Sequence, residues 1–503
     1  MYDTQFIIFI ICILILRLLP IFFGKGFLHR YSYDSGWYFL FSKYFHQRRK
    51  AGDNILKDKL LIYNNIENPS LYPYFLSLFL SFFSESSLKK FFNISLDILF
   101  IFSLYLILSH FEFSQLKIYL ILGLYVLSPI FYSVTNIGPR LYAITPRLLS
   151  EILFTYLLCT YYAFEFLNMY FIILYLIIFS LILYVSKFTL QAIFLLLFPS
   201  LVLNNSYEVL FLSLLTLSLN IYFSKTLRIS MIGQYHHLRW YFSMIKDKLY
   251  LTNRNSLKLI IMSKNLKSLI RSIYKNNSFT STIIKFLPFF VMLYYIDYSE
   301  NIFFVNMLLV SLALFILINS KYLIFLGEAE RYIVHAALPI FIVMGHTFSN
   351  HVLIYFLCFY SLIYVIELIY IYKTYKKDTF FDYDESYKYL ESIEKPQNIL
   401  LNPLNTLSGF ELAARTHHNI FNSSVGFRKD LPNIKIILKE YPIINLKNLD
   451  FIIREYNIDL IILTKDYFES LPDDISKIID NLLSINFIST NGQYRIYKKE
   501  VKY

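Results

Sequence analysis

The sequence predicts an α-helical polytopic membrane protein with a small soluble α/β domain at its C-terminal end. Hydrophobic residues make up 56% of the 503 residues, whereas ordinary soluble domains contain about 45–50%. The excess is concentrated in repeated runs of about 16–22 residues with few charges, which is the length needed to cross roughly 30 Å of hydrocarbon. The chain after residue 375 lacks such runs and alternates short strand and helix patterns.

Apolar length predicts about eleven membrane spans. The runs at 188–203 and 283–298 are short, so each could be re-entrant or tilted against its neighbours. The first run has no small-residue cleavage site after it, so we expect a retained anchor rather than a signal peptide. The spans are expected near residues 5–23, 93–110, 116–134, 148–165, 168–185, 188–203, 206–223, 283–298, 302–319, 333–349 and 352–373.

Charge and cysteine content narrow the class of protein. The net charge is +12, and a basic balance can indicate nucleic-acid binding. Here, however, Lys and Arg cluster between the apolar runs, where lipid phosphates or a phosphorylated lipid substrate are better partners. We therefore expect membrane lipids and no nucleic acid. Cys12, Cys159 and Cys358 each lie in an apolar run, which indicates neither a disulfide framework nor a thiolate metal site.

Two long segments between the spans have amphipathic character. Residues 24–92 contain the stretches 35–48 and 70–84, whose apolar and aromatic residues suit helices lying on a bilayer surface. Residues 224–280 are strongly basic, with Lys and Arg spaced among Leu, Ile and Tyr, a pattern typical of helices in the headgroup layer. We expect interfacial helices in both segments.

The predicted domain division separates a transmembrane domain over 1–375 from a soluble α/β domain over 376–503. Strands alternating with helices indicate a mostly parallel sheet with helices packed on it. Alternating residues around Asn491-Gly492 predict a closing hairpin. No Gly-rich phosphate loop occurs here, so no nucleotide site is expected. The expected elements are the strand QNILLNP (397–403), a helix through GFELAART, the strand HNIFNS, the helix FIIREYN and the strand DLIILTKD.

The order of the spans predicts on which side each polar segment lies. If the N-terminus is cytoplasmic, the segments after odd-numbered spans all fall on the outer side, so every polar cluster shares one face. The positive-inside rule points the other way, because these segments hold nearly all Lys and Arg, with Arg140, Lys187 and Arg331 even in short loops. We expect the outer assignment because of the family resemblance given below.

Asp34 is the first candidate catalytic residue. It follows the first span and precedes the 35–48 stretch, so its carboxylate could face a cavity reached from lipid and from water. Desolvation would favour its protonated form and nearby Arg30 its charged form. A carboxylate held in this way can accept a proton from an acceptor hydroxyl. The alternative is structural, because Asp followed by Ser-Gly-Trp is a fair N-cap for that helix.

A second cluster lies in IGPRLYAITPRLLSEILF (137–154), which contains Arg140, Arg147 and Glu151. Glu151 lies one turn past Arg147, so the two share a helix face and can pair. One interpretation is an intrahelical ion pair at the interface. The other is a rim of acidic and basic groups around a polar substrate, and both stay open.

Two smaller signals lie between later spans. Lys187 is alone between two apolar runs, where it could snorkel to the interface or bind a phosphate. In GQYHHLRWYF (233–242), the adjacent His236 and His237 point apart on a helix and give a weak metal signal. Arg239 and the neighbouring aromatic residues fit a phosphate at the interface equally well.

The last cluster is FLGEAERYIVHAALP (325–339), which enters the tenth predicted span. Arg331 and Tyr332 are expected at its outer end, with Glu328 and Glu330 just outside. An arginine offers a planar fork for bidentate phosphate contact. Pairing between Glu and Arg is the equal alternative.

In this order the motifs resemble the GT-C superfamily of membrane glycosyltransferases, and they are similar to those of protein mannosyltransferases and the lipid A aminoarabinose transferase. The resemblance covers roughly residues 1–375 and depends on the order of short motifs. These are an Asp-bearing first loop (Asp34), a Pro-Arg-x-x-x-Glu span start (Pro146, Arg147, Glu151), a Lys-Phe-Thr turn (Lys187, Phe188, Thr189) and a Glu-Arg-Tyr before a Pro-containing span (Glu330, Arg331, Tyr332, Pro339).

The resemblance implies a lipid-linked sugar donor, usually a polyprenyl-phosphate or dolichyl-phosphate sugar. We expect the sugar to move, with inversion, to a glycan, lipid or protein acceptor. The resemblance also implies an active site on the outer face, as in a bacterial inner membrane, with Asp34 in catalysis and basic residues around the donor phosphate. Ser35 follows Asp34 where mannosyltransferases often carry an acidic pair, and the Trp-Trp-Asp motif of the oligosaccharyltransferase subunit is absent. Neither sequon transfer nor a required divalent metal is therefore expected.

Two other classes fit parts of the sequence. A flippase or transporter of lipid-linked oligosaccharides would favour paired pseudo-symmetric halves and lack a large outer domain. An O-antigen-type polymerase or ligase would carry its large outer loop between late spans, whereas the long loops here follow the first and seventh.

Overall fold

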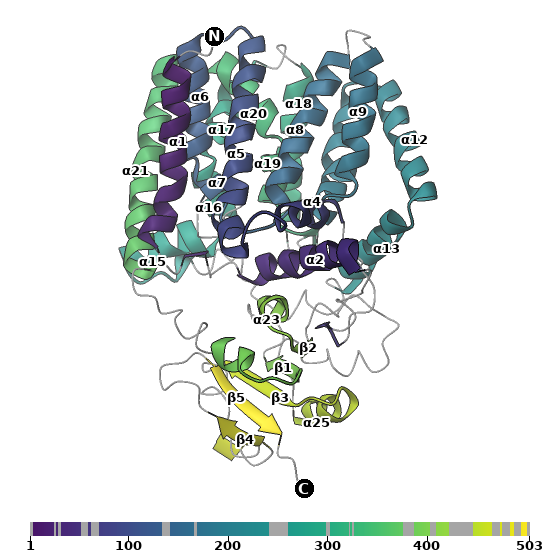
Figure 1. Cartoon of the computed structure of the whole chain (residues 1–503). Helices are drawn as coiled ribbons and strands as arrows, with labels where there is room; N and C mark the ends of the chain where they lie inside the picture. Colours follow the sequence, from purple (N-terminus) through teal and green to yellow (C-terminus); the bar gives the residue numbers. More distant parts are fainter. Residues whose placement is uncertain are drawn as a thin grey trace. The chain divides into compact units, whose positions relative to one another are not determined.

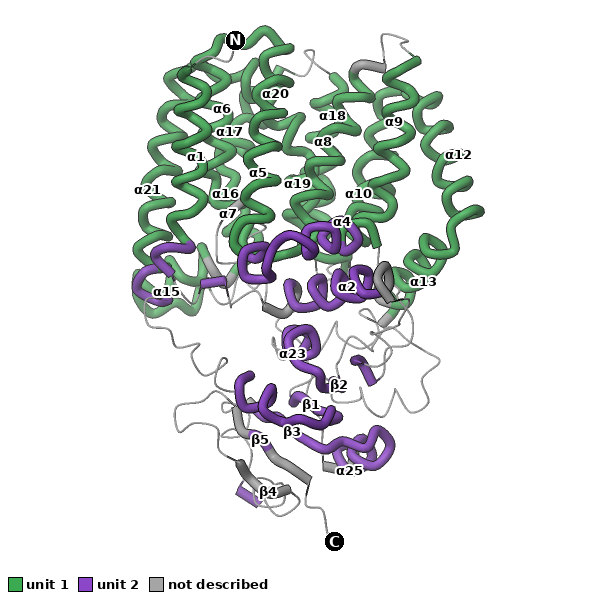
Figure 2. Tube along the Cα trace, viewed as in Figure 1, with its two compact units in different colours: residues 1–20, 67–72, 90–371 green, residues 21–66, 73–89, 372–503 purple. Residues whose placement is uncertain are grey.

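A computed structural model of the chain shows two compact units (Figure 2). Unit 1 comprises residues 1–20, 67–72 and 90–371, and unit 2 comprises 21–66, 73–89 and 372–503. The structure describes residues 4–24, 27–28, 32–51, 59–61, 70–132, 141–164, 169–240, 260–297, 302–320, 322–323, 326–375, 387–402, 409–421, 446–464, 473–474, 483–486 and 494–499.

Unit 1 is a bundle of helices that run side by side (Figure 1). Its first helices are α1 (Thr4–Phe23), α5 (Glu85–His110), α6 (Gln115–Leu127), α7 (Pro129–Tyr132), α8 (Arg147–Phe164) and α9 (Met169–Ile182). There follow α10 (Lys187–Ala192), the π-helical turn η2 (Ile193–Leu197), α11 (Phe198–Leu203), α12 (Tyr207–Phe223), α13 (Lys225–Trp240), α15 (Leu266–Arg271), η4 (Ser272–Asn276), α16 (Ser278–Lys285), α17 (Leu287–Tyr295), α18 (Ile302–Ile318), α19 (Glu330–His335), α20 (Ala337–Thr347) and α21 (Asn350–Tyr375).

Each predicted apolar run coincides with one helix or with consecutive helices. In the described part of the chain, α1, α5 and α21 are long and apolar enough to cross a membrane alone, and two bent helix pairs raise the number to five. The shorter apolar helices are α6, α9, α18, α20 and the helix over 187–203. The chain therefore has the helices of a membrane protein, while the number of about eleven crossings stays a prediction.

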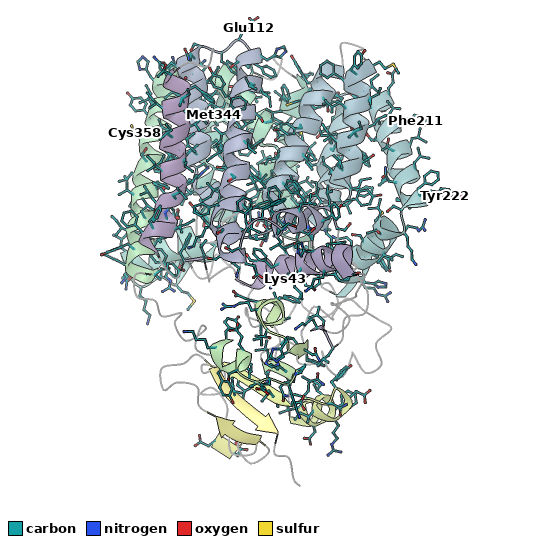
Figure 3. The ribbon with its side chains drawn as sticks, viewed as in Figure 1. Lys43, Glu112, Phe211, Tyr222, Met344 and Cys358 are labelled. Atoms are coloured by element: carbon teal, nitrogen blue, oxygen red, sulfur yellow. The ribbon has the colours of Figure 1, made fainter. Side chains whose placement is uncertain are left out.

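The outer side of the bundle is apolar, as a lipid-facing surface must be. Phe211 and Tyr222 on α12 point outward, with 66% and 73% of their surface exposed (Figure 3). Ile366 on α21 is 56% exposed and Ile8 on α1 is likewise exposed. An exposed apolar surface of this extent is unusual for a soluble protein and typical of a membrane interaction site.

Two pairs of consecutive helices in the bundle are sharply bent. The predicted span near 283–298 is split at Phe286, and α16 and α17 meet at 73°. Pro288 lies in the first turn of α17, where its missing N–H costs no helical hydrogen bond. The basic α13 leaves α12 at 104° after Ser224, so the basic segment turns away from the apolar helix before it.

Unit 2 contains a mixed five-stranded sheet in the order β2-β1-β3-β5-β4. Its strands are β1 (Asn398–Asn402), β2 (Asn419–Phe421), β3 (Leu460–Thr464), β4 (Leu483–Asn486) and β5 (Tyr494–Lys499), with α23 (Gly409–Arg415) and α25 (Leu446–Glu455) between strands. β1 pairs in parallel with β2 and β3, whereas β5 pairs antiparallel with β3 and β4. The strands lie where predicted, but the sheet is half antiparallel because β5 runs antiparallel to β3 and to β4, the second pair being the predicted hairpin. Residues 491–493 of its predicted turn lie outside the described residues.

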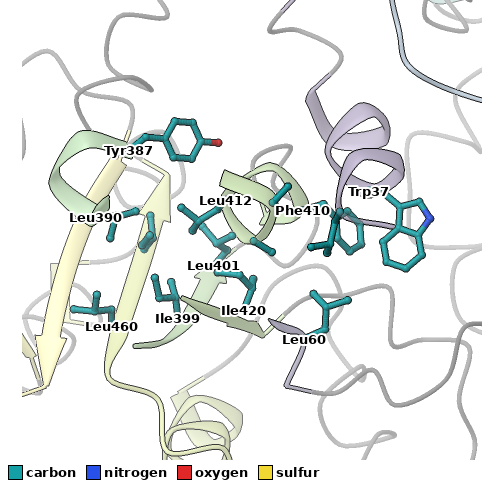
Figure 4. Close-up of a cluster of buried hydrophobic side chains, with 14 of the residues drawn as sticks. Trp37, Leu60, Tyr387, Leu390, Ile399, Leu401, Phe410, Leu412, Ile420 and Leu460 are labelled. Carbon is teal, nitrogen blue, oxygen red and sulfur yellow. The ribbon is translucent and has the colours of Figure 1, made fainter. Parts of the chain in front are cut away.

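The first amphipathic helix belongs to the core of unit 2. α2 (Ser32–Ala51) and α4 (Leu71–Phe79) cover the two predicted stretches. Trp37 of α2 packs against Phe410 of α23 with ring centroids 4.8 Å apart (Figure 4), and Leu40 and Phe41 are buried in the same cluster. The aromatic face expected on a bilayer surface is therefore covered by protein.

Gly36 allows α2 and α23 to approach closely. A Cβ atom at this position would lie 2.5 Å from the backbone nitrogen of Glu411. No side chain can occupy that space without moving the backbone of α23. Gly36 and Trp37, in the Ser-Gly-Trp sequence after Asp34, thus determine how α2 packs against α23.

Candidate functional site

One polar cluster of unit 1 is built around Arg331, the second residue of α19. Its Nε and Nη2 donate to the Glu328 carboxylate. The Nη1 of Arg147, at the start of α8, lies 3.8 Å from Oε2 of the same carboxylate. One glutamate thus lies between two guanidinium groups, and the cluster carries a net positive charge. The predicted loops after the third and ninth spans meet at this point.

The aromatic ring of Phe188 stacks against the Arg331 guanidinium. The Cζ atom of Arg331 lies 3.6 Å from the centroid of the ring, a stacked arrangement in which the ring face attracts the cation. Phe188 is placed by the start of α10, where the Ser186 hydroxyl accepts its backbone N–H at 3.2 Å. The loop after the fifth predicted span therefore joins the same site.

Gly327 is required by the loop that carries Glu328. Its φ angle is +108°, a conformation that residues with a side chain rarely adopt. A Cβ atom there would also lie 3.0 Å from Cε1 of Phe188. Both the turn and the close approach to the ring therefore favour glycine.

The cluster presents buried polar atoms that the described residues leave without hydrogen-bond partners. Arg331 is only 8% exposed, and its Nη1 has no partner in the described part of the chain. The hydroxyl of the adjacent Tyr332, 4% exposed, likewise has none there. Buried polar groups are normally hydrogen-bonded. A guanidinium with a spare N–H beside a second arginine is suited to bind an oxyanion such as a phosphate.

A further layer of contacts fixes α19 beneath this site. Glu330 is completely buried and accepts a hydrogen bond from the Ser278 hydroxyl at 3.1 Å. The Nδ1 of His335 donates to the Arg331 carbonyl at 2.7 Å, and the imidazole packs edge-on against Phe154. Glu330, expected just outside the tenth predicted span, is the first residue of α19 and is buried within the protein.

Lys187 and Glu151 flank the cluster on its supporting helices. Lys187 is the first residue of α10 and is half-buried, and Glu151 is buried on α8. The Thr189 hydroxyl donates to the Ser150 hydroxyl at 2.7 Å, which ties these two helices together. Their starts are therefore held in fixed register beside Arg331.

Other predicted site residues lie elsewhere or beyond the described residues. His236 is half-buried and Arg239 exposed on α13, and the contacts that define the Arg331 cluster involve neither. Asp34 lies in the first turn of α2, which begins at Ser32, so it is not the residue before the helix. The Asp34 side chain is outside the described residues, as are Arg30, Arg140 and the side chain of His237.

Several residues of this site carry little signal in the sequence. Glu328 was expected just outside the span, and it precedes α19. Phe188 appeared only as part of the Lys-Phe-Thr motif. Ser278 and His335 carried no local signal, because their partners are distant in sequence or lie on the backbone. Among the described side chains, no group of three or more His, Cys, Asp or Glu is arranged to hold a metal ion.

Comparison with known proteins identifies the fold. No protein-family model matches the chain, and no curated protein matches its sequence. The structure is similar to ArnT from Cupriavidus metallidurans in the apo state, with a TM-score of 0.56 and 10% identity over 98% of this chain and 97% of that one. It is also similar to the Archaeoglobus fulgidus oligosaccharyltransferase in complex with Zn and sulfate, with a TM-score of 0.51 and 12% identity over 97% and 73%.

A third similar structure is the Archaeoglobus fulgidus oligosaccharyltransferase AglB in complex with an inhibitory peptide and a dolichol-phosphate. It has a TM-score of 0.51 and 11% identity over 98% of this chain and 74% of that one. These likenesses show that the chain has the overall fold of ArnT and of the archaeal oligosaccharyltransferase, which is the fold expected from the GT-C resemblance. The resemblance first indicated by the order of the motifs is confirmed at the level of the fold.

Proposed function

We propose that the protein is a membrane glycosyltransferase that moves a sugar from a polyprenyl-phosphate donor to an acceptor hydroxyl, with inversion at the anomeric carbon. The observation that carries the proposal is the buried Arg331 guanidinium, stacked on Phe188, with a spare N–H beside Arg147. The GT-C fold and the dolichol-phosphate bound to the similar AglB support it.

The role of the cluster is to bind the phosphate of the donor and stabilise it as it leaves. In the reaction, the bond from the anomeric carbon to the phosphate oxygen breaks and negative charge grows on that oxygen. Guanidinium groups fixed beforehand stabilise such charge without reorganising. Lys187 and the Tyr332 hydroxyl are further donors, and Glu328 holds the two guanidinium groups in place. Glu330 and Glu151 are proposed as supporting residues on α19 and α8.

Asp34 is the proposed general base. It accepts the proton of the acceptor hydroxyl while the hydroxyl oxygen forms its bond to the anomeric carbon, so the proton moves to the carboxylate and the electron pair moves to the phosphate. Arg30, Arg140, His236, His237 and Arg239 are proposed to contact the donor phosphate or headgroup.

The proposal includes a membrane arrangement. In this proposed arrangement the chain crosses a bacterial inner membrane about eleven times. The Arg331 cluster and the segments 24–92 and 224–280 then lie on its outer side, and residues 376–503 form a soluble α/β domain there. The acceptor is a glycan, lipid or protein hydroxyl. A lipid-borne donor explains why basic residues gather in these segments against the positive-inside rule.

Membranes containing the protein and a radiolabelled polyprenyl-phosphate sugar test this function. We expect label in a water-soluble or acceptor-linked product with the native protein and none with Asp34→Asn at equal protein level. Movement of intact labelled lipid across the membrane without transfer would indicate a flippase instead. Transfer that persists in Asp34→Asn removes Asp34 from the mechanism.

A further inference from the structure

Unit 2 holds a cavity of about 520 Å³ lined by none of the predicted site residues. α2 contributes Lys43 and His46, and His417 follows the end of α23. Lys59 and Glu85 complete the polar lining. Two lysines and two histidines against one glutamate make this cavity a basic site.

The two lysines are held by backbone carbonyls at the end of α23. Lys43 donates to the Ala414 carbonyl at 2.5 Å and also pairs with Glu85. Lys59 donates to the Thr416 carbonyl at 2.6 Å. Cations are favoured near the carbonyl end of a helix, so these contacts explain why the lysines converge. The carbonyl groups are uncharged, and Glu85 neutralises only the charge of Lys43.

Lys59 is the uncompensated cation. Across the residues that the structure describes, it has no carboxylate partner, and an ammonium group has three donors. Burial, and then the neighbouring charge of Lys43, lowers the pKa of Lys59 to about 8. An anion in the cavity would relieve both effects.

The histidines differ in role. His418 accepts the Gln397 backbone N–H at Nδ1 and donates from Nε2 to the Leu390 carbonyl at 2.7 Å. These two hydrogen bonds indicate a neutral imidazole with its proton on Nε2. The ring of His418 therefore has a structural role. The adjacent His417 is exposed and lines the cavity, as does His46. Both can offer a ring N–H to a ligand.

We propose that this cavity binds a phosphate group through Lys59 and Lys43, with His46 and His417 as further donors. Lysines serve as point charges for phosphate. The phosphate belongs either to a lipid headgroup or to a soluble compound, and Leu80 and Phe83 give the cavity an apolar side.

The phosphate site is separate from the proposed catalytic acid. Lys43 and His46 follow Asp34 by nine and twelve residues in α2, which corresponds to roughly 14–18 Å along the helix axis. Binding in the cavity therefore does not depend on the glycosyl-transfer chemistry proposed for Asp34.

Binding to the full-length protein in phosphatidylcholine nanodiscs tests the site with two probes. The first is inorganic phosphate, measured by calorimetry, and the second is phosphatidic acid added to the nanodisc, measured by native mass spectrometry. Binding of phosphatidic acid alone supports a headgroup ligand. Binding of both supports a site for the phosphate group itself, and binding of neither overturns the proposal.

Variants locate the binding. Lys59→Gln is expected to weaken the affinity at least about tenfold, the loss of one charge-assisted hydrogen bond, while the exposed Lys395→Gln binds as the native protein does. His417→Gln is expected to weaken the affinity several-fold. If Lys59→Gln does not fold, the affinity of His417→Gln serves as the test instead. Native affinity in a folded Lys59→Gln, or in His417→Gln where that variant decides, overturns the proposal.

Discussion

Arg17 on α1 donates from Nε to the Asp97 carboxylate on α5 at 2.9 Å, eighty residues away, and both side chains are almost completely buried in unit 1. The Tyr125 hydroxyl donates to the other carboxylate oxygen at 2.7 Å, and the Nη1 of Arg17 donates to the Val126 carbonyl at 2.7 Å. The pair thus joins α1, α5 and α6. Buried charges are tolerated only when paired and hydrogen-bonded, and here most donors and acceptors are used.

Asp97→Asn is expected to destabilise the bundle, because it leaves the buried Arg17 charge uncompensated. Removing one partner of a buried ion pair costs about 3–5 kcal/mol. Thermal unfolding of the purified protein in detergent measures the effect. Arg17→Met combined with Asp97→Leu removes both charges, so this variant should be more stable than Asp97→Asn. Equal unfolding temperatures for the native protein and Asp97→Asn would contradict a structural role.

Gly36→Ala is expected to loosen unit 2, because the new methyl group would lie 2.5 Å from the Glu411 backbone nitrogen. Overpacking of this kind typically costs about 1–3 kcal/mol. Limited proteolysis of the 372–503 segment reports the change. Gly123→Ala is the matched control, because its Cβ meets only the movable end of Leu357. Equal protease resistance in the two variants would contradict close packing of α2 on α23.

Arg331→Lys is expected to lower transfer about 10- to 100-fold, because lysine provides neither the planar fork nor the stacked contact with Phe188. Loss of hydrogen bonds to a charged group is worth about 1.5–3 kcal/mol. The donor dependence of transfer, as kcat/KM, is the measurement. Arg271→Lys, on an exposed part of α15, should leave it unchanged. An unaltered kcat/KM in Arg331→Lys would show that the cluster is purely structural.

The stability of the protein is expected to increase with pH above about 8 through Lys59. Its pKa in the folded state is about 8, below the value of about 10.4 for an unfolded lysine. Between these values the unfolded state binds more protons, so unfolding becomes less favourable as pH rises. Below pH 8 both states are protonated and the unfavourable burial of the charge is fully present. The unfolding temperature of the native protein relative to that of Lys59→Gln should therefore rise from pH 7.5 to 10. If the difference between the two temperatures does not change over this range, the prediction is wrong.

The positions of the helices could be predicted from sequence because hydrocarbon thickness sets the length of an apolar run. The strands β1, β2 and β3 could be predicted because short apolar runs between polar residues leave few alternatives. The antiparallel β5 beside β3 could not, since strand order depends on long-range packing. The Arg17–Asp97 pair was also hidden, because each charge is a lone interruption of an apolar run and only folding brings them together.

At the candidate site, local sequence identified Arg147, Lys187 and Arg331 but not their relationship. The sequence predicted either phosphate contact by Arg331 or its pairing with a nearby glutamate. The structure places Glu328 between two arginines and Arg331 on an aromatic ring. The role of Phe188 could not be predicted, because the chain contains 50 phenylalanines and nothing in the local sequence distinguishes this one.

The most direct measurement separates donor binding from transfer in one preparation. Purified native protein, Asp34→Asn and Arg331→Met are each incubated with a radiolabelled polyprenyl-phosphate sugar, and bound donor and transferred label are counted separately. We expect Asp34→Asn to bind donor normally but to transfer none, and Arg331→Met to fail at binding. Undiminished transfer by Asp34→Asn would contradict the central claim that this carboxylate takes the proton of the acceptor.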